Sequence, residues 1–231
     1  MFLRQLRTYL VRSFSSGAIC NKSKGGSSSS WMKRHVSDPY VINSVKDNYR
    51  ARSAYKLLEI NKSAKIIRRG DTVVECGAAP GAWTQVATSL VGGDGLVVSC
   101  DLLNMEPVPG AVLLTNRDFT KVETWREIRS VVGDNKIQVV LSDMAPNVSG
   151  NPEMDHDAIT HLVYTVLKFS LHNAAPGSCL LTKTFNGRNH DKLMKDLELC
   201  YENVKLYKPS SSRNESSELF LLAQNLKEIK K

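Results

Sequence analysis

The chain has 231 residues, of which 42% are hydrophobic, and a formal net charge of +8 at pH 7. This size fits one α/β domain with a substantial core plus an N-terminal extension. No run of about 18 apolar residues is present, so we expect no membrane-spanning helix. The five cysteines are odd in number and lack Cys-x-x-Cys spacing, which favours a reduced compartment and predicts no metal site.

The positive charge is unevenly distributed along the chain. Residues 1–37 hold seven Lys/Arg and no acid, whereas residues 38–231 have a net charge of only +1. A second division, which overlaps the first at residues 33–37, gives residues 33–69 a net charge of +7 and residues 70–231 a net charge of −4. High overall basicity therefore does not by itself indicate a nucleic-acid partner, but one flank of the domain is strongly basic.

Residues 1–30 have the pattern of a targeting segment followed by a linker. Arg4, Arg7 and Arg12 alternate with apolar residues at helical spacing, serines follow, and acids are absent. This pattern is typical of a mitochondrial transit peptide, with a basic RNA-binding tail as the alternative. Residues 24–30 (KGGSSSS) resemble a flexible linker. We therefore expect a mitochondrial matrix protein with a single domain over residues 31–231.

The basic flank, residues 31–69, combines cations with aromatic side chains. A helix is predicted over residues 50–60, with Ala54, Leu57 and Leu58 on its apolar face. Cations contact phosphates, and tyrosine or tryptophan rings stack on unpaired bases. The expected RNA ligands are Lys33, Arg34, Arg50, Arg52 and Lys56, interleaved with Trp31, Tyr40, Tyr49 and Tyr55. The alternative is a solvated charged face on a packing helix.

From residue 71 onward, strand and helix patterns alternate. The predicted strands are Thr72–Glu75, Leu96–Asp101, Ala111–Leu114, Ile137–Leu141, Ser178–Lys183, Val204–Tyr207 and Leu219–Ala223. The predicted helices are Ala82–Leu90, Val122–Val132, Asp157–Asn173 and His190–Cys200. Alternation of this kind predicts an α/β fold with a mostly parallel sheet. Because no helix separates the last two strands, one of them is expected to run antiparallel.

The stretch Thr72–Trp83 predicts a strand, a tight turn and a helix. Gly77 and Gly81 follow the acid Glu75. Glycine permits a positive φ or a close backbone approach to a ligand. Such a turn at the carboxyl end of a parallel strand is where open α/β sheets bind ligands. The Gly-x-Gly-x-x-Gly fingerprint of dinucleotide sites is absent, and an ordinary glycine-bearing turn remains the alternative.

Three further strands are each followed by an acid. Asp101 lies 24 residues after Gly77, a spacing suited to accepting hydrogen bonds from a ribose diol. Asp118 precedes Phe119, and this pair suits an adenine amine and ring, although Asp118 is equally suited to capping the helix that begins at Val122. Asp143 belongs to Ser-Asp-Met-Ala-Pro-Asn, which lacks the Pro-Pro-aromatic run typical of methylation at exocyclic amines.

Two charged residues mark the C-terminal strands. Lys183 ends a buried strand, where an ammonium is costly unless it is paired or near water. It can act there as a base or hold an oxyanion, or its amine can extend into solvent at the sheet edge. Glu218 opens the last strand and is favoured over Glu215 as a partner for a lysine, because strand alternation places it at the strand tip.

Together these motifs resemble the FtsJ/RrmJ family of RNA ribose 2′-O-methyltransferases. The resemblance covers residues 31–223 and implies a Rossmann-like, seven-stranded fold that binds S-adenosylmethionine (SAM). It implies a catalytic tetrad made of Lys56, Asp143, Lys183 and Glu218. The implied cofactor contacts are Gly77, Pro80, Gly81, Ala82, Trp83, Asp101, Asp118, Phe119 and Asp143. Ala82 replaces a glycine that many members have, and Glu75 replaces the more usual Asp.

The resemblance, together with the presequence, implies 2′-O-methylation of a uridine in mitochondrial large-subunit ribosomal RNA by a monomeric enzyme that supports ribosome biogenesis. Three alternatives stay open. The first is a tRNA 2′-O-ribose methyltransferase of the same family. The second is a ribosome-assembly factor whose methyl transfer is dispensable. The third is a protein or small-molecule methyltransferase, which would leave the basic flank without a purpose.

Overall fold

A seven-stranded sheet organises the molecule, in a computed structural model that describes residues 38–147, 149–187, 189–213 and 216–228. The strands are β1 (Thr72–Cys76), β2 (Leu96–Cys100), β3 (Ala111–Leu114), β4 (Ile137–Ser142), β5 (Ala174–Phe185), β6 (Tyr201–Tyr207) and β7 (Glu218–Leu226). Their spatial order is β3-β2-β1-β4-β5-β7-β6. The first five strands pair in parallel, and β7 runs antiparallel between β5 and β6.

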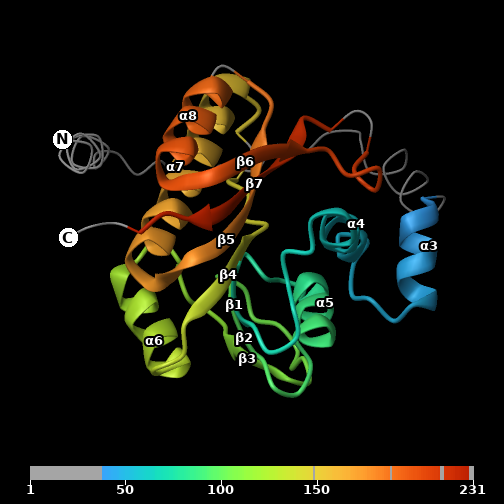
Figure 1. Cartoon of the computed structure of the whole chain (residues 1–231). Coiled ribbons are helices and arrows are strands. Elements are labelled where there is room, and N and C mark those ends of the chain that lie inside the picture. The colour runs from blue at the N-terminus through green and yellow to red at the C-terminus, as the bar shows by residue number, and fades with distance from the viewer. Residues whose placement is uncertain (1–37, 148, 188, 214–215, 229–231) are drawn as a thin grey trace. The chain divides into compact units, whose positions relative to one another are not determined.

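Six helices accompany the sheet in the described part of the chain. They are α3 (Pro39–Lys46), α4 (Ala54–Ala64), α5 (Ala82–Val91), α6 (Val122–Val132), α7 (Pro152–Asn173) and α8 (His190–Cys200). Helices α4 and α5 lie on one face of the sheet, and α6, α7 and α8 cover the other (Figure 1). The strand order reverses between β1 and β4, and open α/β sheets bind ligands outside the carboxyl ends of the strands at such a point.

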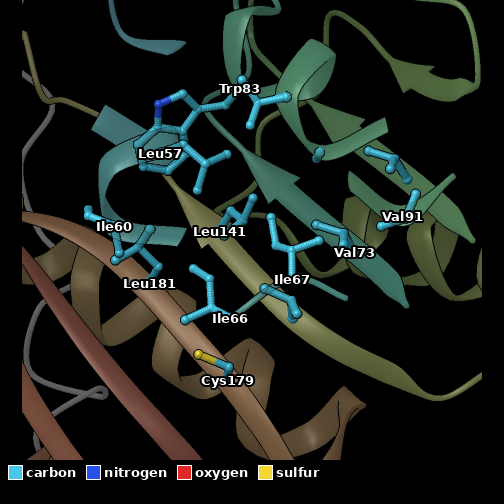
Figure 2. Close-up of a cluster of buried hydrophobic side chains, with 14 of the residues drawn as sticks. Leu57, Ile60, Ile66, Ile67, Val73, Trp83, Val91, Leu141, Cys179 and Leu181 are labelled. Carbon is cyan, nitrogen blue, oxygen red and sulfur yellow. The ribbon is translucent and has the colours of Figure 1, made fainter. Parts of the chain in front are cut away.

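The core beneath α4 and α5 is made of aliphatic side chains around Trp83 (Figure 2). Leu57 from α4 and Leu141 from β4 have no exposed surface, and Trp83 from α5 is 2% exposed. Burying one large apolar side chain contributes about 1.5–3 kcal/mol. This packing fixes α4, which carries Lys56, and α5, which follows the glycine turn, against the same sheet face.

The predicted fold class is confirmed, including the antiparallel direction of one of the last two strands. Some boundaries differ from the prediction. Helix α4 begins at Ala54, so Arg50 and Arg52 precede it, and β5 and β7 both extend beyond their predicted ends. Helix α3 was not predicted, although Asp38 caps it and Pro39 occupies its first turn.

The expectations for residues 1–30, including the targeting segment and the linker, concern residues outside the described ranges. Among the residues that are described, no helix is both long and apolar enough to cross a bilayer. Cys76, Cys100, Cys179 and Cys200 are buried free thiols. Burial raises the pKa of the Cys200 thiol to about 11, so this group stays protonated at neutral pH.

Candidate active site

The turn between β1 and α5 requires glycine at two positions. Gly77 has a φ of +74°, and a Cβ there would lie 2.7 Å from the backbone nitrogen of Met144, directly after β4. Gly81 has a φ of +105° and precedes the first residue of α5. The turn therefore packs its bare backbone against the end of β4, at the point where the strand order reverses.

The other residues of this turn that are predicted to contact the cofactor are Pro80, Ala82 and Trp83. The carbonyl of Pro80 accepts a hydrogen bond from Arg50, and Ala82 is 1% exposed. The Trp83 indole nitrogen donates to the carbonyl of Ser53 at 2.8 Å. The Trp83 ring packs on Phe220, with centroids 5.6 Å apart. The Trp83 side chain thus packs in the core. That Trp83 contacts the cofactor stays a prediction.

Asp101 links the turn between β1 and α5 to the loop that follows β2. Its Oδ2 accepts from the backbone nitrogen of Ala79, and its Oδ1 accepts from that of Leu103, each at 2.8 Å. A carboxylate offers about four acceptor positions, so capacity for ligand hydroxyls remains. The expected ribose contact stays a prediction, but the structural role of Asp101 at this edge is clear.

Asp118 and Phe119 follow β3. Asp118 Oδ1 accepts from both the nitrogen and the hydroxyl of Thr120, at 2.9 and 2.7 Å. The N-cap of α6 is Lys121, so the alternative that Asp118 caps this helix is wrong. Phe119 is 3% exposed and packs edge-on against Phe169, with centroids 5.1 Å apart. Its ring is therefore chiefly a core side chain, and its adenine contact stays a prediction.

Glu75 is buried beneath this edge. Its Oε2 accepts from the hydroxyls of Thr84 at 2.6 Å and Ser99 at 2.7 Å, which joins β1, α5 and β2. Desolvation by burial raises the pKa of Glu75 to about 7, and the nearby negative charges of Asp143 and Asp101 add to the rise. Through these two hydrogen bonds, Glu75 holds the ends of β1 and β2 and the first turn of α5 together.

The four residues of the predicted tetrad meet at the ends of β4, β5 and β7 and on α4. Lys183 Nζ lies 2.8 Å from Asp143 Oδ1 and 4.0 Å from Glu218 Oε2. Lys56 Nζ lies 2.6 Å from Glu218 Oε1. The charges thus alternate along a line that runs Lys56, Glu218, Lys183, Asp143. Each buried ammonium has a carboxylate partner, which offsets the cost of desolvating it.

Lys183 is 8% exposed and makes its closest contacts with one residue. Its Nζ donates to the backbone oxygen of Asp143 at 2.7 Å and is paired with the carboxylate of the same residue. An ammonium has three donors. In the described ranges no other acceptor is within hydrogen-bonding distance of Nζ, so one donor is available to a substrate oxygen.

Sequence reasoning missed two residues that support this line. Ser212 donates from its hydroxyl to Glu218 Oε1 at 3.1 Å. Glu59, one helical turn after Lys56, accepts from the backbone nitrogens of Ser210 at 2.7 Å and Ser211 at 3.1 Å. The spacing of Lys56 and Glu59, three residues apart on α4, places both on one helix face and could have indicated the link.

The predicted RNA ligands are only partly described, since Lys33 and Arg34 fall outside the described residues. Arg50 donates to three backbone oxygens within the protein. Arg52 pairs with Asp38 and donates to the carbonyl of Ser211, and its guanidinium lies 5.4 Å from the Tyr40 ring centroid. Their RNA contacts stay predictions, but both side chains have acceptors inside the molecule.

No cluster of three or more potential metal ligands occurs among the described residues. Four carboxylates, from Glu75, Asp101, Asp118 and Asp143, nevertheless gather near the ends of neighbouring strands. The first three all help raise the pKa of the Cys100 thiol to about 12 after burial, which locates their charges in one region. Such an edge favours a cationic ligand that carries hydroxyl donors.

Comparisons with known proteins find similarity to one family of methyltransferases. Residues 49–226 match the model of the FtsJ-like methyltransferase family. The mitochondrial rRNA methyltransferase 2 of Drosophila melanogaster is 44% identical over 214 residues, which cover 89% of this chain and 86% of that protein. The ribosomal RNA large subunit methyltransferase E of Psychrobacter arcticus is 42% identical over 205 residues, covering 89% of this chain and 97% of the relative.

A solved structure shares the fold. The crystal structure of a ribosomal RNA methyltransferase from Plasmodium falciparum superposes with a TM-score of 0.66 at 24% identity. The match covers 77% of this chain and 98% of that one. At this identity the similarity concerns the fold, and it agrees with the mostly parallel seven-stranded sheet.

Proposed function

The chain belongs to the FtsJ-like methyltransferase family, and on that premise we propose that it transfers the methyl group of SAM to a ribose 2′-oxygen of RNA. The observation that carries the proposal is the alternating line of Lys56, Glu218, Lys183 and Asp143 at the carboxyl edge of the sheet. A hydroxyl acceptor needs a positioned polar group for its oxygen and a route for its proton, and this line offers both.

The residues at the glycine turn fit SAM. Gly77 and Gly81 bring bare backbone to the switch point, and the carboxylates of Asp101, Asp118 and Asp143 add negative charge at the neighbouring strand ends. SAM carries a sulfonium, an ammonium and a ribose diol, which such carboxylates would hold. When bound, SAM supplies an electrophilic methyl group. The chain then has to align the acceptor and assist the loss of its proton.

Lys183 is the proposed partner of the acceptor oxygen. As a neutral amine, Lys183 Nζ would accept the hydroxyl proton with its lone pair; as an ammonium, its remaining N–H donor would instead stabilise the developing oxyanion. Asp143 orients Lys183 through two contacts. Glu218 connects Lys183 with Lys56, whose side chain is 13% exposed and would be the member of the line nearest to the RNA.

Ribosomal RNA is the proposed substrate, and a uridine of the large subunit is the proposed target. The names of the Drosophila and Psychrobacter relatives support rRNA. A mitochondrial location is supported by the name of the Drosophila relative and by the Arg- and Ser-rich, acid-free residues 1–16. The matrix is the proposed compartment within the mitochondrion, because the proposed RNA substrate is found there. A tRNA substrate is the second candidate within the family, since the same four side chains would serve any ribose.

The test is methyl transfer in vitro. The purified protein is incubated with radiolabelled SAM and either mitochondrial large-subunit rRNA or total tRNA, and the RNA is digested to nucleosides. We expect label in a 2′-O-methylnucleoside from rRNA. Label on a base, or label only in tRNA, would contradict the proposed chemistry or the proposed substrate respectively.

A further inference from the structure

The guanidinium of Arg50 connects two loops that border the glycine turn. Its Nη1 donates to the carbonyl oxygens of Pro80 at 3.0 Å and Glu106 at 2.7 Å. Its Nη2 donates to that of Pro107 at 2.7 Å. Pro80 lies between β1 and α5, whereas Glu106 and Pro107 lie between β2 and β3. One side chain from the basic flank thus ties two loops of the sheet edge together.

These contacts are closely packed around Gly81. A Cβ at that position would lie 2.9 Å from Arg50 Nη1 and 3.2 Å from Val108 Cγ2. Val108 belongs to the same loop as Pro107 and is 4% exposed. The glycine at position 81 therefore lets the guanidinium and the β2–β3 loop both pack against the turn.

The backbone of Arg50 is itself held by α5. The Arg50 nitrogen donates to Gln85 Oε1 at 2.9 Å, and Gln85 Nε2 donates to the carbonyl of Asn48 at 2.9 Å. A planar guanidinium presents its donors in a fixed fork, so little side-chain entropy is lost per bond formed. Helix α5 therefore positions the backbone of Arg50, and the Arg50 guanidinium in turn contacts Pro80, which lies just before α5.

We propose that Arg50 is a positioning residue of the cofactor site rather than an RNA ligand. It holds the β1–α5 turn and the β2–β3 loop in their relative arrangement, beside the second tie that Asp101 makes to the nitrogen of Ala79. Loops ordered before binding cost less free energy to order in the complex. The inference rests on the proposal that this turn binds SAM.

The test compares Arg50→Lys and Arg50→Gln with the wild type in two titrations. Lysine keeps the charge but cannot span three carbonyls in one plane. For both variants we expect the Kd for SAM, by calorimetry, to rise about tenfold, since two or three hydrogen bonds from a charged group are lost. The affinity for RNA at one fixed salt concentration should stay within about twofold for both.

Arg69→Lys and Arg69→Gln are the matched controls. Arg69 belongs to the same basic flank but packs beside Gly92 at the other end of α5, with its side chain 77% exposed. These variants should bind SAM like the wild type. Hydrogen exchange of the unliganded protein gives an independent readout at Gly81 and Ala111, whose amides donate to the carbonyls of Ala78 and Val108 in the two loops. Only the Arg50 variants should lose protection at these two amides.

Wild-type affinity for SAM in Arg50→Lys, with unchanged protection of the Gly81 and Ala111 amides, would overturn the inference. So would a pattern in which Arg50→Gln weakens RNA binding and leaves SAM binding intact. A wild type that fails to bind SAM would instead refute the proposed function, and hydrogen exchange would still test the brace. If Arg50→Lys does not fold, Gln85→Met removes the bond that orients Arg50 and should weaken SAM binding in the same direction.

Discussion

The most specific prediction for a single residue concerns the role of Lys183 in catalysis, because its ammonium is buried between Asp143 and Glu218. Lys183→Met keeps the length of the side chain and removes the polar group that would meet the 2′-oxygen. We expect kcat to fall about 10²-fold or more, with the Kd for SAM changed little. Steady-state kinetics with RNA and calorimetry with SAM measure the two quantities.

Lys195→Met is the matched control, since Lys195 lies exposed on α8. It should have wild-type kcat. A Lys183→Met protein that is folded, by its thermal transition, and that retains kcat within about threefold of the wild type would remove Lys183 from the chemistry.

The titration of Glu75 should make the stability of the fold depend on pH. Its pKa is raised from 4.5 in the unfolded reference to about 7 in the fold, so the folded state binds the proton more tightly. The stabilising contribution of protonated Glu75 is complete below pH 4.5 and is lost as the pH rises to about 7. Above that range the buried carboxylate is charged and costs stability.

Glu75→Gln removes this titration while keeping the shape of the side chain. The free energy of unfolding of the wild type minus that of Glu75→Gln should fall by roughly 2–3 kcal/mol between about pH 5 and pH 8. Urea denaturation across this range measures it. A difference that does not change with pH would show that Glu75 does not titrate in the fold.

At the residue scale, sequence patterns locate charges but not their partners. Asp143, Lys183 and Glu218 could be predicted to meet because the tips of neighbouring strands converge at one edge. Arg50 and Arg52 resemble RNA ligands from charge alone, yet each donates to backbone carbonyls inside the protein. Backbone acceptors carry no sequence signature, so these contacts need the folded chain.

At the scale of elements, α4 links the tetrad to the loop between β6 and β7. The helix carries Lys56 and, one turn later, Glu59, which binds the backbone of Ser210 and Ser211. The next residue, Ser212, donates to Glu218. Helix α4 therefore positions both members of the Lys56–Glu218 pair, one directly and one through the loop.

Glu59→Ala should consequently lower kcat for methyl transfer by about tenfold and leave the Kd for SAM unchanged. Glu59→Gln keeps one of the two acceptor oxygens and presents an amide nitrogen to the other backbone N–H, so it should recover only part of the loss. Kinetics with both variants test this. An equal rise in the Kd for SAM, or a Glu59→Ala protein with wild-type kcat, would contradict the positioning role.

Element existence could be predicted far better than element ends. The buried runs of β1, β2 and β4 are apolar and β-branched, so the strands are evident from the sequence. The sequence predicts too early a start for α4, because Arg50 and Arg52 continue its helical pattern. In the fold, the tertiary contacts of these two arginines hold their segment outside the helix. Helix α3 is short and its Asp38-Pro39 start is the only strong local signal.

At the scale of the whole molecule, the two halves of the site come from different parts of the chain. Strands β1, β2 and β3 end in the acids and glycines proposed to hold SAM, whereas α4, β5 and β7 supply the lysines and Glu218 proposed to meet the acceptor. Asp143, at the end of β4, lies at the reversal of strand order and belongs to both. This arrangement is the basis for assigning methyl transfer to a hydroxyl.

The most direct test of that assignment is a map of 2′-O-methyl positions in mitochondrial large-subunit rRNA from cells that lack the protein. We predict that one uridine loses its 2′-O-methyl group, that the wild-type chain restores it, and that an equally abundant Lys183→Met chain does not. An unchanged map in the cells without the protein, or full restoration by Lys183→Met, would contradict the account.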